Sequence, residues 1–167
     1  MIPKSILGYL QRHGVEFERL QHPEAVTGAE LAASLHVSGR QVAKTVLVES
    51  AGSTWMAVLP ACEQVDPVRL GEALHHGPVR LLGEEEVAGL FPDCQLGAEP
   101  PFGQKYGVPV IVDSALASAR YIVVRAGSHR EALALPYPEY VRLEHPKVAS
   151  FAVFPQEARV TTAAIRP

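Results

Sequence analysis

The sequence contains little of what disulfide scaffolds, membrane proteins or exported chains require. It has 2 cysteines, Cys62 and Cys94, without C-x-x-C spacing, so we expect a reducing compartment and small buried thiols. The longest apolar stretch, Trp55 to Cys62, is much shorter than the roughly 18 residues that span a bilayer. The N-terminal segment lacks the uninterrupted apolar region of a signal peptide. These absences predict a cytoplasmic protein with no membrane partner.

Several sequence signatures of catalysis are absent as well. The 7 histidines are scattered apart from His75 and His76, so no short-spaced set of metal ligands is present and we expect no metal. The glycine-rich loops that bind nucleotide phosphates are missing, and we expect no cofactor. No G-x-S-x-G elbow occurs, and Ser128 and His129, as neighbours, would point to opposite faces of a strand. Any hydrolysis must therefore use something other than a side-chain nucleophile.

Neither sign of charge is in large excess, because the sequence has 15 Lys and Arg and 18 Asp and Glu, which gives a formal net charge of −3. A uniform positive field that attracts nucleic acid is excluded, whereas a local basic groove is not. The chain lacks a helix-turn-helix signature, so DNA is not an expected partner. Its 167 residues, 47% hydrophobic and 20% charged, predict one globular domain with its own core.

Periodicity and capping signals predict helices alternating irregularly with strands. Thr27 and Glu30 form a capping box, and Asp66 followed by Pro67 is an N-cap pair. One predicted helix follows Pro3, and the others cover 28–36, the segment from Asp66 to Gly77, 84–90 and 138–143. The predicted strands are 15–20, 41–49, 54–59, 79–82, 108–113, 121–125 and 132–135. Because hairpins alternate with crossovers, we expect a mixed-sheet α+β domain.

Two segments predict no regular element. Residues 91–107 are rich in proline and glycine, which indicates a rigid loop. After Lys147 the signal fades, so we place the domain at 1–152 and a C-terminal tail at 153–167.

Lys44 interrupts the start of an otherwise apolar strand, Gln41 to Val48. One interpretation is a strand-end lysine whose ammonium reaches water. The other is a lysine at the mouth of a cleft that engages a phosphate or a carbonyl oxygen. Composition alone favours the first interpretation.

The loop from Leu96 to Gly103 places two glycines around Pro100 and Pro101. This arrangement fixes the backbone and leaves peptide N–H groups uncrowded, as an oxyanion hole requires. A rigid turn that packs Phe102 explains the same residues equally well.

Taken in order, these pieces resemble the YbaK and prolyl-tRNA synthetase editing-domain superfamily of trans-acting aminoacyl-tRNA deacylases, over roughly residues 5–152. The segment Thr27-Gly-Ala-Glu-Leu-Ala-Ala is similar to the family's Thr-x-x-Glu-x-Ala helix, and Gln41-Val-Ala-Lys-Thr45 to its lysine strand. Gly97-Ala-Glu-Pro-Pro101 resembles its G-x-x-x-P loop, and Ala126-Gly-Ser-His129 resembles a stretch found in one branch of stand-alone members.

The resemblance implies a strongly bent, barrel-like mixed sheet with surrounding helices and a cleft for the aminoacyl 3′ end of tRNA. It implies hydrolysis of the ester between tRNA and a misactivated small amino acid of the Ala, Ser, Thr or Cys type. Lys44 would contact the terminal adenosine or its phosphate, and Gly97 would present backbone N–H groups to the substrate carbonyl. The implied substrate-binding residues are Thr45, Pro101, Phe102, Gly103, Gly127 and His129, with Pro101 holding the loop rigid and His129 orienting water.

Some features depart from that pattern. Glu99 and Pro100 stand where other members carry small or hydroxyl residues, which leaves the amino acid specificity open. The acidic net charge predicts modest, salt-dependent binding of mischarged tRNA, with an aminoacyl-tRNA synthetase as a second candidate partner. A non-catalytic module that binds an aminoacyl-tRNA end or a small ligand is the alternative function. The candidate phosphate contacts are Arg40, Lys44, Arg125, Arg130 and Lys147.

Overall fold

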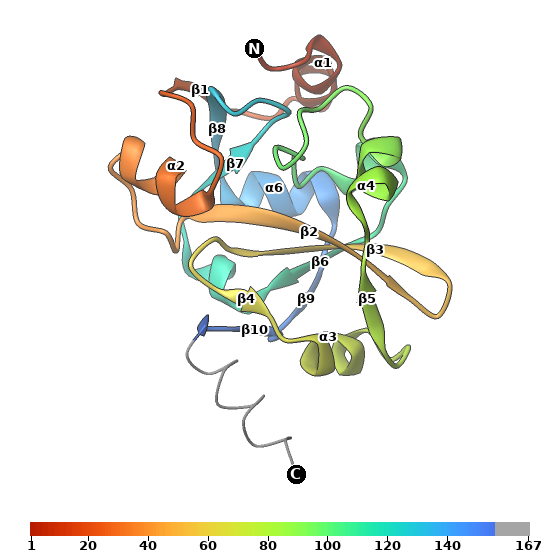
Figure 1. The fold of residues 1–167 in the computed structure, drawn as a ribbon. Helices are drawn as coiled ribbons and strands as arrows, with labels where there is room; N and C mark the ends of the chain where they lie inside the picture. Colours follow the sequence, from red (N-terminus) through yellow and green to blue (C-terminus); the bar gives the residue numbers. More distant parts are fainter. Residues whose placement is uncertain (156–167) are drawn as a thin grey trace.

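A computed structural model describes residues 1–155 as a mixed sheet with helices around it (Figure 1). The main sheet has eight strands in the order β1-β8-β7-β2-β3-β6-β9, with β5 paired to β2 outside this path. These strands are β1 (Glu18–Gln21), β2 (Val42–Ser50), β3 (Ser53–Pro60), β5 (Val79–Leu81), β6 (Val110–Asp113), β7 (Tyr121–Arg125), β8 (Glu131–Pro136) and β9 (Lys147–Ala149). The predicted mixed α+β domain is confirmed.

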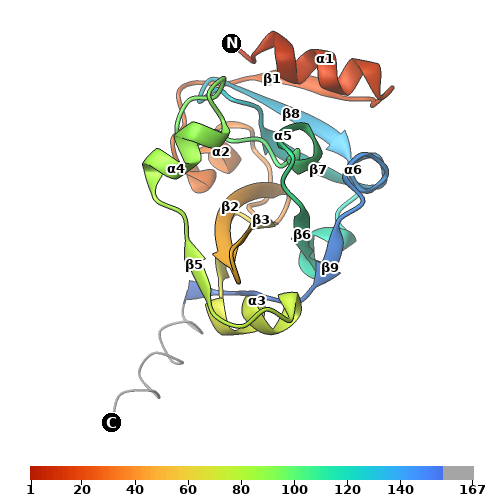
Figure 2. The ribbon, with the colours of Figure 1, turned by 90° about the vertical axis from the view of Figure 1, so that its right-hand side faces the viewer.

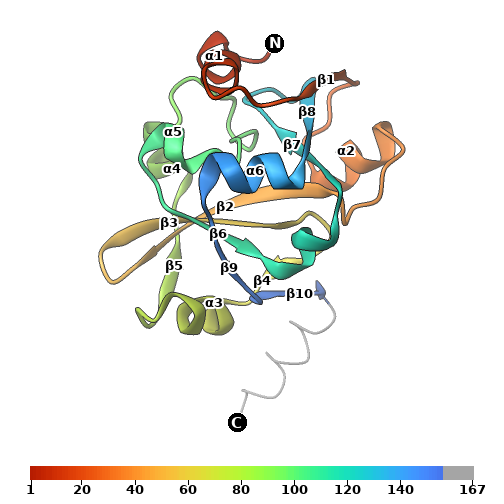
Figure 3. The ribbon, with the colours of Figure 1, turned by 180° about the vertical axis from the view of Figure 1, so that it is seen from behind.

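The helices lie around the sheet rather than in one layer (Figure 2). They are α1 (Lys4–Arg12), α2 (Gly28–Ser34), α3 (Pro67–Leu74), α4 (Glu84–Leu90), α5 (Gly103–Tyr106) and α6 (Tyr137–Glu144). Figure 3 shows α6 crossing the side of the molecule that faces away from the viewer in Figure 1. No helix within residues 1–155 is long and apolar enough to cross a membrane.

The helix starts follow the capping chemistry of the sequence. Thr27 Oγ1 accepts from the Glu30 N–H at 3.1 Å, and Glu30 Oε2 accepts from the Thr27 N–H at 3.1 Å. Asp66 Oδ1 accepts from the N–H groups of Val68 and Arg69. Both predicted caps are confirmed, because each depends on residues within three positions along the chain.

Alternation along β2 and β3 divides the core between the two faces of the sheet. Ala43 and Leu47 belong to the largest apolar cluster, together with residues of α1 and α6. The other face of β2 carries Val42, which packs with α2, and Val48, which packs with α3. Successive side chains of a strand point to opposite faces, so Lys44 shares a face with Val42 and Val48, between α2 and α3.

The structure corrects several expectations. The segment 91–107 contains the one-turn helix α5, which begins at Gly103 and ends before Gly107 at φ +70°. The strands β4 (Gln64–Val65), β9 and β10 (Ala152–Val153) and the 3-10 helix η1 (Ser114–Ser118) were not predicted. Cys62 is exposed and Cys94 is half-buried, and both are free thiols.

Two further expectations concern the limits of the fold. Within residues 1–155, the end strands β1 and β9 of the main path do not pair with each other, so a barrel-like closure is not confirmed. The predicted tail begins at Val153, which lies in β10, where it pairs with Gln64 of β4. The rest of that tail, 156–167, lies outside the described residues.

Candidate functional site

Lys44 and Arg125 are brought together by the parallel pairing of β2 and β7. Val42 pairs with Val123, and Ala43 with Val124, so the next residues in this register are Lys44 and Arg125. Neighbouring strands lie about 4.7–4.9 Å apart, and both residues face the side of the sheet that carries α2. This register places two cations next to each other where the strands separate.

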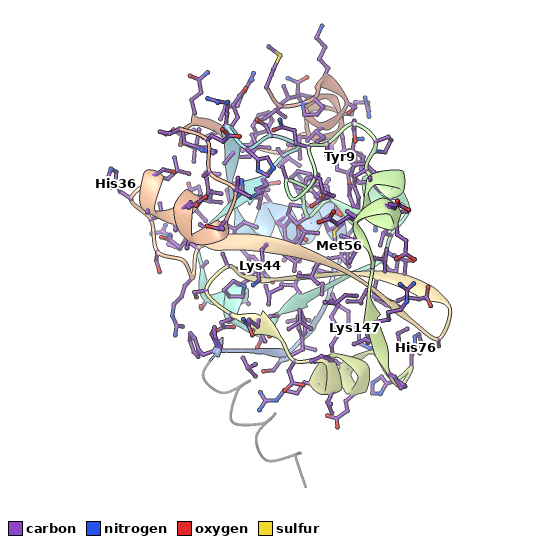
Figure 4. The ribbon with its side chains drawn as sticks, viewed as in Figure 1. Tyr9, His36, Lys44, Met56, His76 and Lys147 are labelled. Carbon is purple, nitrogen blue, oxygen red and sulfur yellow. The ribbon has the colours of Figure 1, made fainter. Side chains whose placement is uncertain are left out.

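Both cations line one small pocket of about 210 Å³ beside α2 and the Gly97 loop. Figure 4 shows Lys44 on β2 near the centre of the view, whereas His36 and His76 lie at opposite edges. The pocket is lined by Val26, Gly28, Val42, Ala43, Lys44, Thr45, Gly97, Glu99 and Arg125. Three predicted site residues, Lys44, Thr45 and Gly97, therefore meet, together with Glu99 and Arg125.

Lys44 also borders a second cavity, of about 270 Å³, on the α3 side. Burial lowers the pKa of the Lys44 ammonium, while the charges of Cys62 and Glu63 act in the opposite direction. Lys44 is half-buried and lines both cavities, so a ligand in either one can contact its side chain.

The Gly97 loop is held in shape from both sides. Gly97 has φ +85°, a conformation that disfavours any side chain. The Ala98 N–H donates to Gln95 O, and the Gly127 N–H donates to Ala98 O at 2.7 Å. The Gly97 N–H, which the resemblance assigns to a substrate carbonyl, donates to Glu99 Oε1 at 2.8 Å. The Glu99 N–H has no acceptor within residues 1–155.

Arg125 anchors the start of α2 while it lines the pocket. Its guanidinium donates to the carbonyl oxygens of Ala25, Val26 and Thr27 at 2.7–3.0 Å. Burial lowers the pKa of Arg125, and the charges of Glu30 and Glu99 partly offset that effect. Since its acceptors are neutral carbonyls, its positive charge remains to act on the pocket.

His129 and Gly127 support the loop from behind. His129 Nε2 lies 2.8 Å from Leu96 O, and its Nδ1 lies 3.4 Å from an Arg125 nitrogen. A ring that donates to Leu96 O presents Nδ1 to Arg125 as an acceptor. Gly127 has φ +88°, and a Cβ there would lie 2.8 Å from Pro3 Cδ. Neither residue lines the pocket.

Pro101, Phe102 and Gly103, at the end of the loop, do not line the pocket. Pro101 O accepts from the Tyr140 hydroxyl at 2.8 Å, and Phe102 is fully buried in the largest apolar cluster. A Cβ on Gly103 would lie 2.3 Å from Val108 O. These contacts fix the loop to the core.

Other parts of the described chain offer less chemistry. A larger cavity, of about 710 Å³ between α3 and β5, has only Glu72 and His75 as ionisable lining residues and contains none of the predicted site residues. Within residues 1–155, no three His, Cys, Asp or Glu side chains gather as metal ligands would.

Fold and site together define an α+β domain with a small, charged pocket beside a glycine-proline loop. The chain belongs to the aminoacyl-tRNA editing domain family, whose sequence pattern matches residues 22–143. The predicted family is confirmed, and an editing role follows from it.

Solved structures agree on the fold. The chain is similar to hypothetical protein APE2540, with a TM-score of 0.82 and 26% identity over 90% of this chain and 100% of that one. It is similar to a proposed trans-editing enzyme for prolyl-tRNA synthetase, with a TM-score of 0.80 and 20% identity over 92% and 99% of the two chains. A proposed signal transduction protein from Marinobacter aquaeolei VT8 shares the fold over 31% of its length, with a TM-score of 0.73 and 15% identity over 92% of this chain. No curated protein matches the sequence.

Proposed function

We propose that this protein is a trans-acting deacylase that hydrolyses the ester bond of tRNA mischarged with a small amino acid. The observation that carries the proposal is the convergence of Lys44, Arg125 and the Gly97 loop on one pocket. Two cations and the Glu99 N–H beside a rigid turn suit a carbonyl oxygen on which negative charge develops.

The size of the pocket supports a small amino acid. Its volume of about 210 Å³ lies below the roughly 300–1,000 Å³ of sites that enclose a drug-sized ligand. An aminoacyl group of the Ala, Ser, Thr or Cys type fits such a space, with the ribose left at the mouth. Lys44 lines this pocket and also borders the neighbouring cavity, so it would lie between the ester carbonyl and the terminal adenosine or its phosphate.

The proposed reaction needs no side-chain nucleophile. A water oxygen attacks the ester carbonyl carbon, and the Lys44 ammonium and the unengaged Glu99 N–H stabilise the oxyanion. The bond to the ribose oxygen then breaks, and this oxygen receives the proton that the attacking water gives up, so that tRNA and the free amino acid are released. Removal of one such donor typically costs about 2.7–4 kcal/mol of transition-state stabilisation.

The proposed partners are a mischarged tRNA and, as a source of that tRNA, a prolyl-tRNA synthetase. We place this activity in the cytoplasm, where the synthetase would release the mischarged tRNA. The structural relative described as a trans-editing enzyme for prolyl-tRNA synthetase supports this context.

One observation favours a second candidate, a module that binds an aminoacyl-tRNA end without hydrolysing it. The Gly97 N–H is already engaged by Glu99, which removes one donor from the set available to a substrate carbonyl. In that case Lys44 would provide affinity rather than catalysis.

The test is hydrolysis of a panel of Ala-, Ser-, Thr- and Cys-tRNA species by wild type, Lys44→Ala and the control Lys4→Ala, in which an exposed lysine of α1 is removed. We expect wild type and the control to deacylate at least one species, and Lys44→Ala to be slower by about a hundredfold or more with an unchanged melting temperature. Near wild-type rates for Lys44→Ala would refute the role of this lysine. Saturable binding by wild type without hydrolysis would establish the second candidate.

A further inference from the structure

The Glu99 carboxylate is a negative charge inside a pocket whose other charged groups are cations. Glu99 is 9% exposed and lines the pocket with Lys44 and Arg125. Its Oε1 accepts the Gly97 N–H at 2.8 Å. Its Oε2 accepts no hydrogen bond within residues 1–155. One carboxylate oxygen is therefore held in place and the other is available to a ligand.

A carboxylate in this place works against a purely anionic ligand. It would repel a phosphate or an oxyanion, and burying it costs free energy that one backbone hydrogen bond only partly offsets. The neighbouring guanidinium of Arg125 is directed to three carbonyl oxygens, so Glu99 is not needed as its ion-pair partner. The pocket thus offers positive and negative charge side by side to whatever occupies it.

An aminoacyl ester carries the matching pair of groups. Its carbonyl oxygen becomes negative during hydrolysis, and its α-amino group is an ammonium two bonds away from that carbonyl carbon. On the protein side, an N–H donor and a carboxylate both belong to Glu99, a residue of the pocket lining.

We propose that Glu99 is a specificity-determining residue that binds the free α-ammonium of the aminoacyl group and so excludes N-acylated ends. This inference rests on the proposed function and assigns to Glu99 the substrate class of that site, namely tRNA esters with an unblocked amino group. The Gly97 N–H then serves as a positioning group, since it orients the carboxylate.

A cationic side chain on the substrate is the competing partner for Glu99. The small volume of the pocket favours the α-ammonium, which every aminoacyl-tRNA carries whatever its side chain. Acetylation of the α-amino group separates the two cases, because it removes the ammonium and leaves the side chain unchanged.

The experiment compares the hydrolysis of Ala-tRNA and N-acetyl-Ala-tRNA and the binding of two hydrolysis-resistant probes, 3′-alanylamino-3′-deoxyadenosine and its N-acetyl form. The proteins are wild type, Glu99→Gln and the control Glu85→Gln, which changes an exposed residue of α4. Glutamine retains an oxygen for the Gly97 N–H and loses only the charge.

We expect wild type and the control to prefer the free amine about tenfold to a hundredfold, the range of one charge-assisted hydrogen bond. We expect Glu99→Gln to lose this preference through weaker binding of the free amine. If wild type hydrolyses both esters equally, or Glu99→Gln keeps the preference, the inference is refuted while the deacylase function remains. If wild type hydrolyses no species of the Ala-, Ser-, Thr- and Cys-tRNA panel and does not bind the free-amine probe, both proposals are refuted. Binding with the preference, but without hydrolysis of any species, supports Glu99 and refutes only the deacylase.

Discussion

Arg125 joins the pocket to the segment that starts α2, and this connection exists only in the folded chain. Its three carbonyl acceptors lie 98–100 positions earlier in the sequence. The guanidinium has five N–H donors in a fixed plane, so it can serve these carbonyls at once, which an ammonium cannot do with the same geometry.

We predict that Arg125→Lys lowers the free energy of unfolding by about 2–4 kcal/mol and also slows deacylation, although the charge is kept. Buried carbonyls would lose their donors, and the Val26 wall of the pocket would shift. Urea unfolding and kcat/KM measured on the same preparations test this, with Arg120→Lys, at an exposed arginine, as the matched control. Unchanged stability with reduced activity would instead show that Arg125 acts on the substrate alone.

The residues of the site were predictable from the sequence to different degrees. Lys44 stood out because a charge interrupted an apolar strand, and the structure places it with Thr45 and Gly97 in one pocket. The place of Arg125 depends on the register of two parallel strands far apart in the chain, and the contact from Gly97 to Glu99 depends on a side-chain rotamer. Neither leaves a pattern in the sequence. Phe102 and Gly103 were expected in the pocket lining and pack into the core instead.

Among the elements, those with local signals were predicted and those held by distant partners were not. The capped helices α2 and α3 begin at Gly28 and Pro67, next to the predicted caps. The strands β4, β9 and β10 have two or three residues each, and they pair with segments far away in the sequence. Helix α5 is a single turn between Gly103 and Gly107, so its glycines were interpreted as marks of a loop.

Asp93 ties three of these elements together. It follows α4, and its carboxylate accepts from the Ser5 hydroxyl of α1 and from the Lys105 ammonium and the Tyr106 hydroxyl of α5. Burial raises the pKa of Asp93, but these donors outweigh that effect and lower it to about 2, from an ordinary value of 3.8.

Because the folded pKa lies below the unfolded one, the stabilisation by Asp93 is fully present above about pH 4 and is lost as the pH falls towards 2. The shift corresponds to about 2 kcal/mol. We predict that Asp93→Asn is less stable than wild type at pH 5 and that this difference shrinks at pH 2.5. Urea unfolding at both pH values measures it, with Glu16→Gln, at an exposed residue, as the control. A difference independent of pH would contradict an ionic contribution.

On the scale of the whole molecule, a chain of net charge −3 must bind a polyanion through a local group of cations. Arg130 follows His129 next to the Gly97 loop, and its ion pair with Glu24, 3.5 Å long, is exposed on both sides and therefore weak. Lys147 lies on β9, which is separated from β2 by β3 and β6 in the sheet. Of these two candidate phosphate contacts, Arg130 therefore lies near the pocket and Lys147 lies away from it across the sheet.

We predict that tRNA affinity falls with rising salt and that Arg130→Gln reduces this dependence while Lys147→Gln does not. Each phosphate contact to a single strand contributes about −0.7 to the slope of log K against log salt concentration. Arg130→Gln should therefore make the slope shallower by about that amount and weaken binding most at low salt. Titration of uncharged tRNA from low to high salt measures the slopes, and Arg80→Gln, which removes an exposed cation already paired with Glu49 and Glu86, should behave as wild type. An equal loss of slope in Arg130→Gln and Lys147→Gln would show that the RNA extends across the sheet to β9 instead of ending at the pocket.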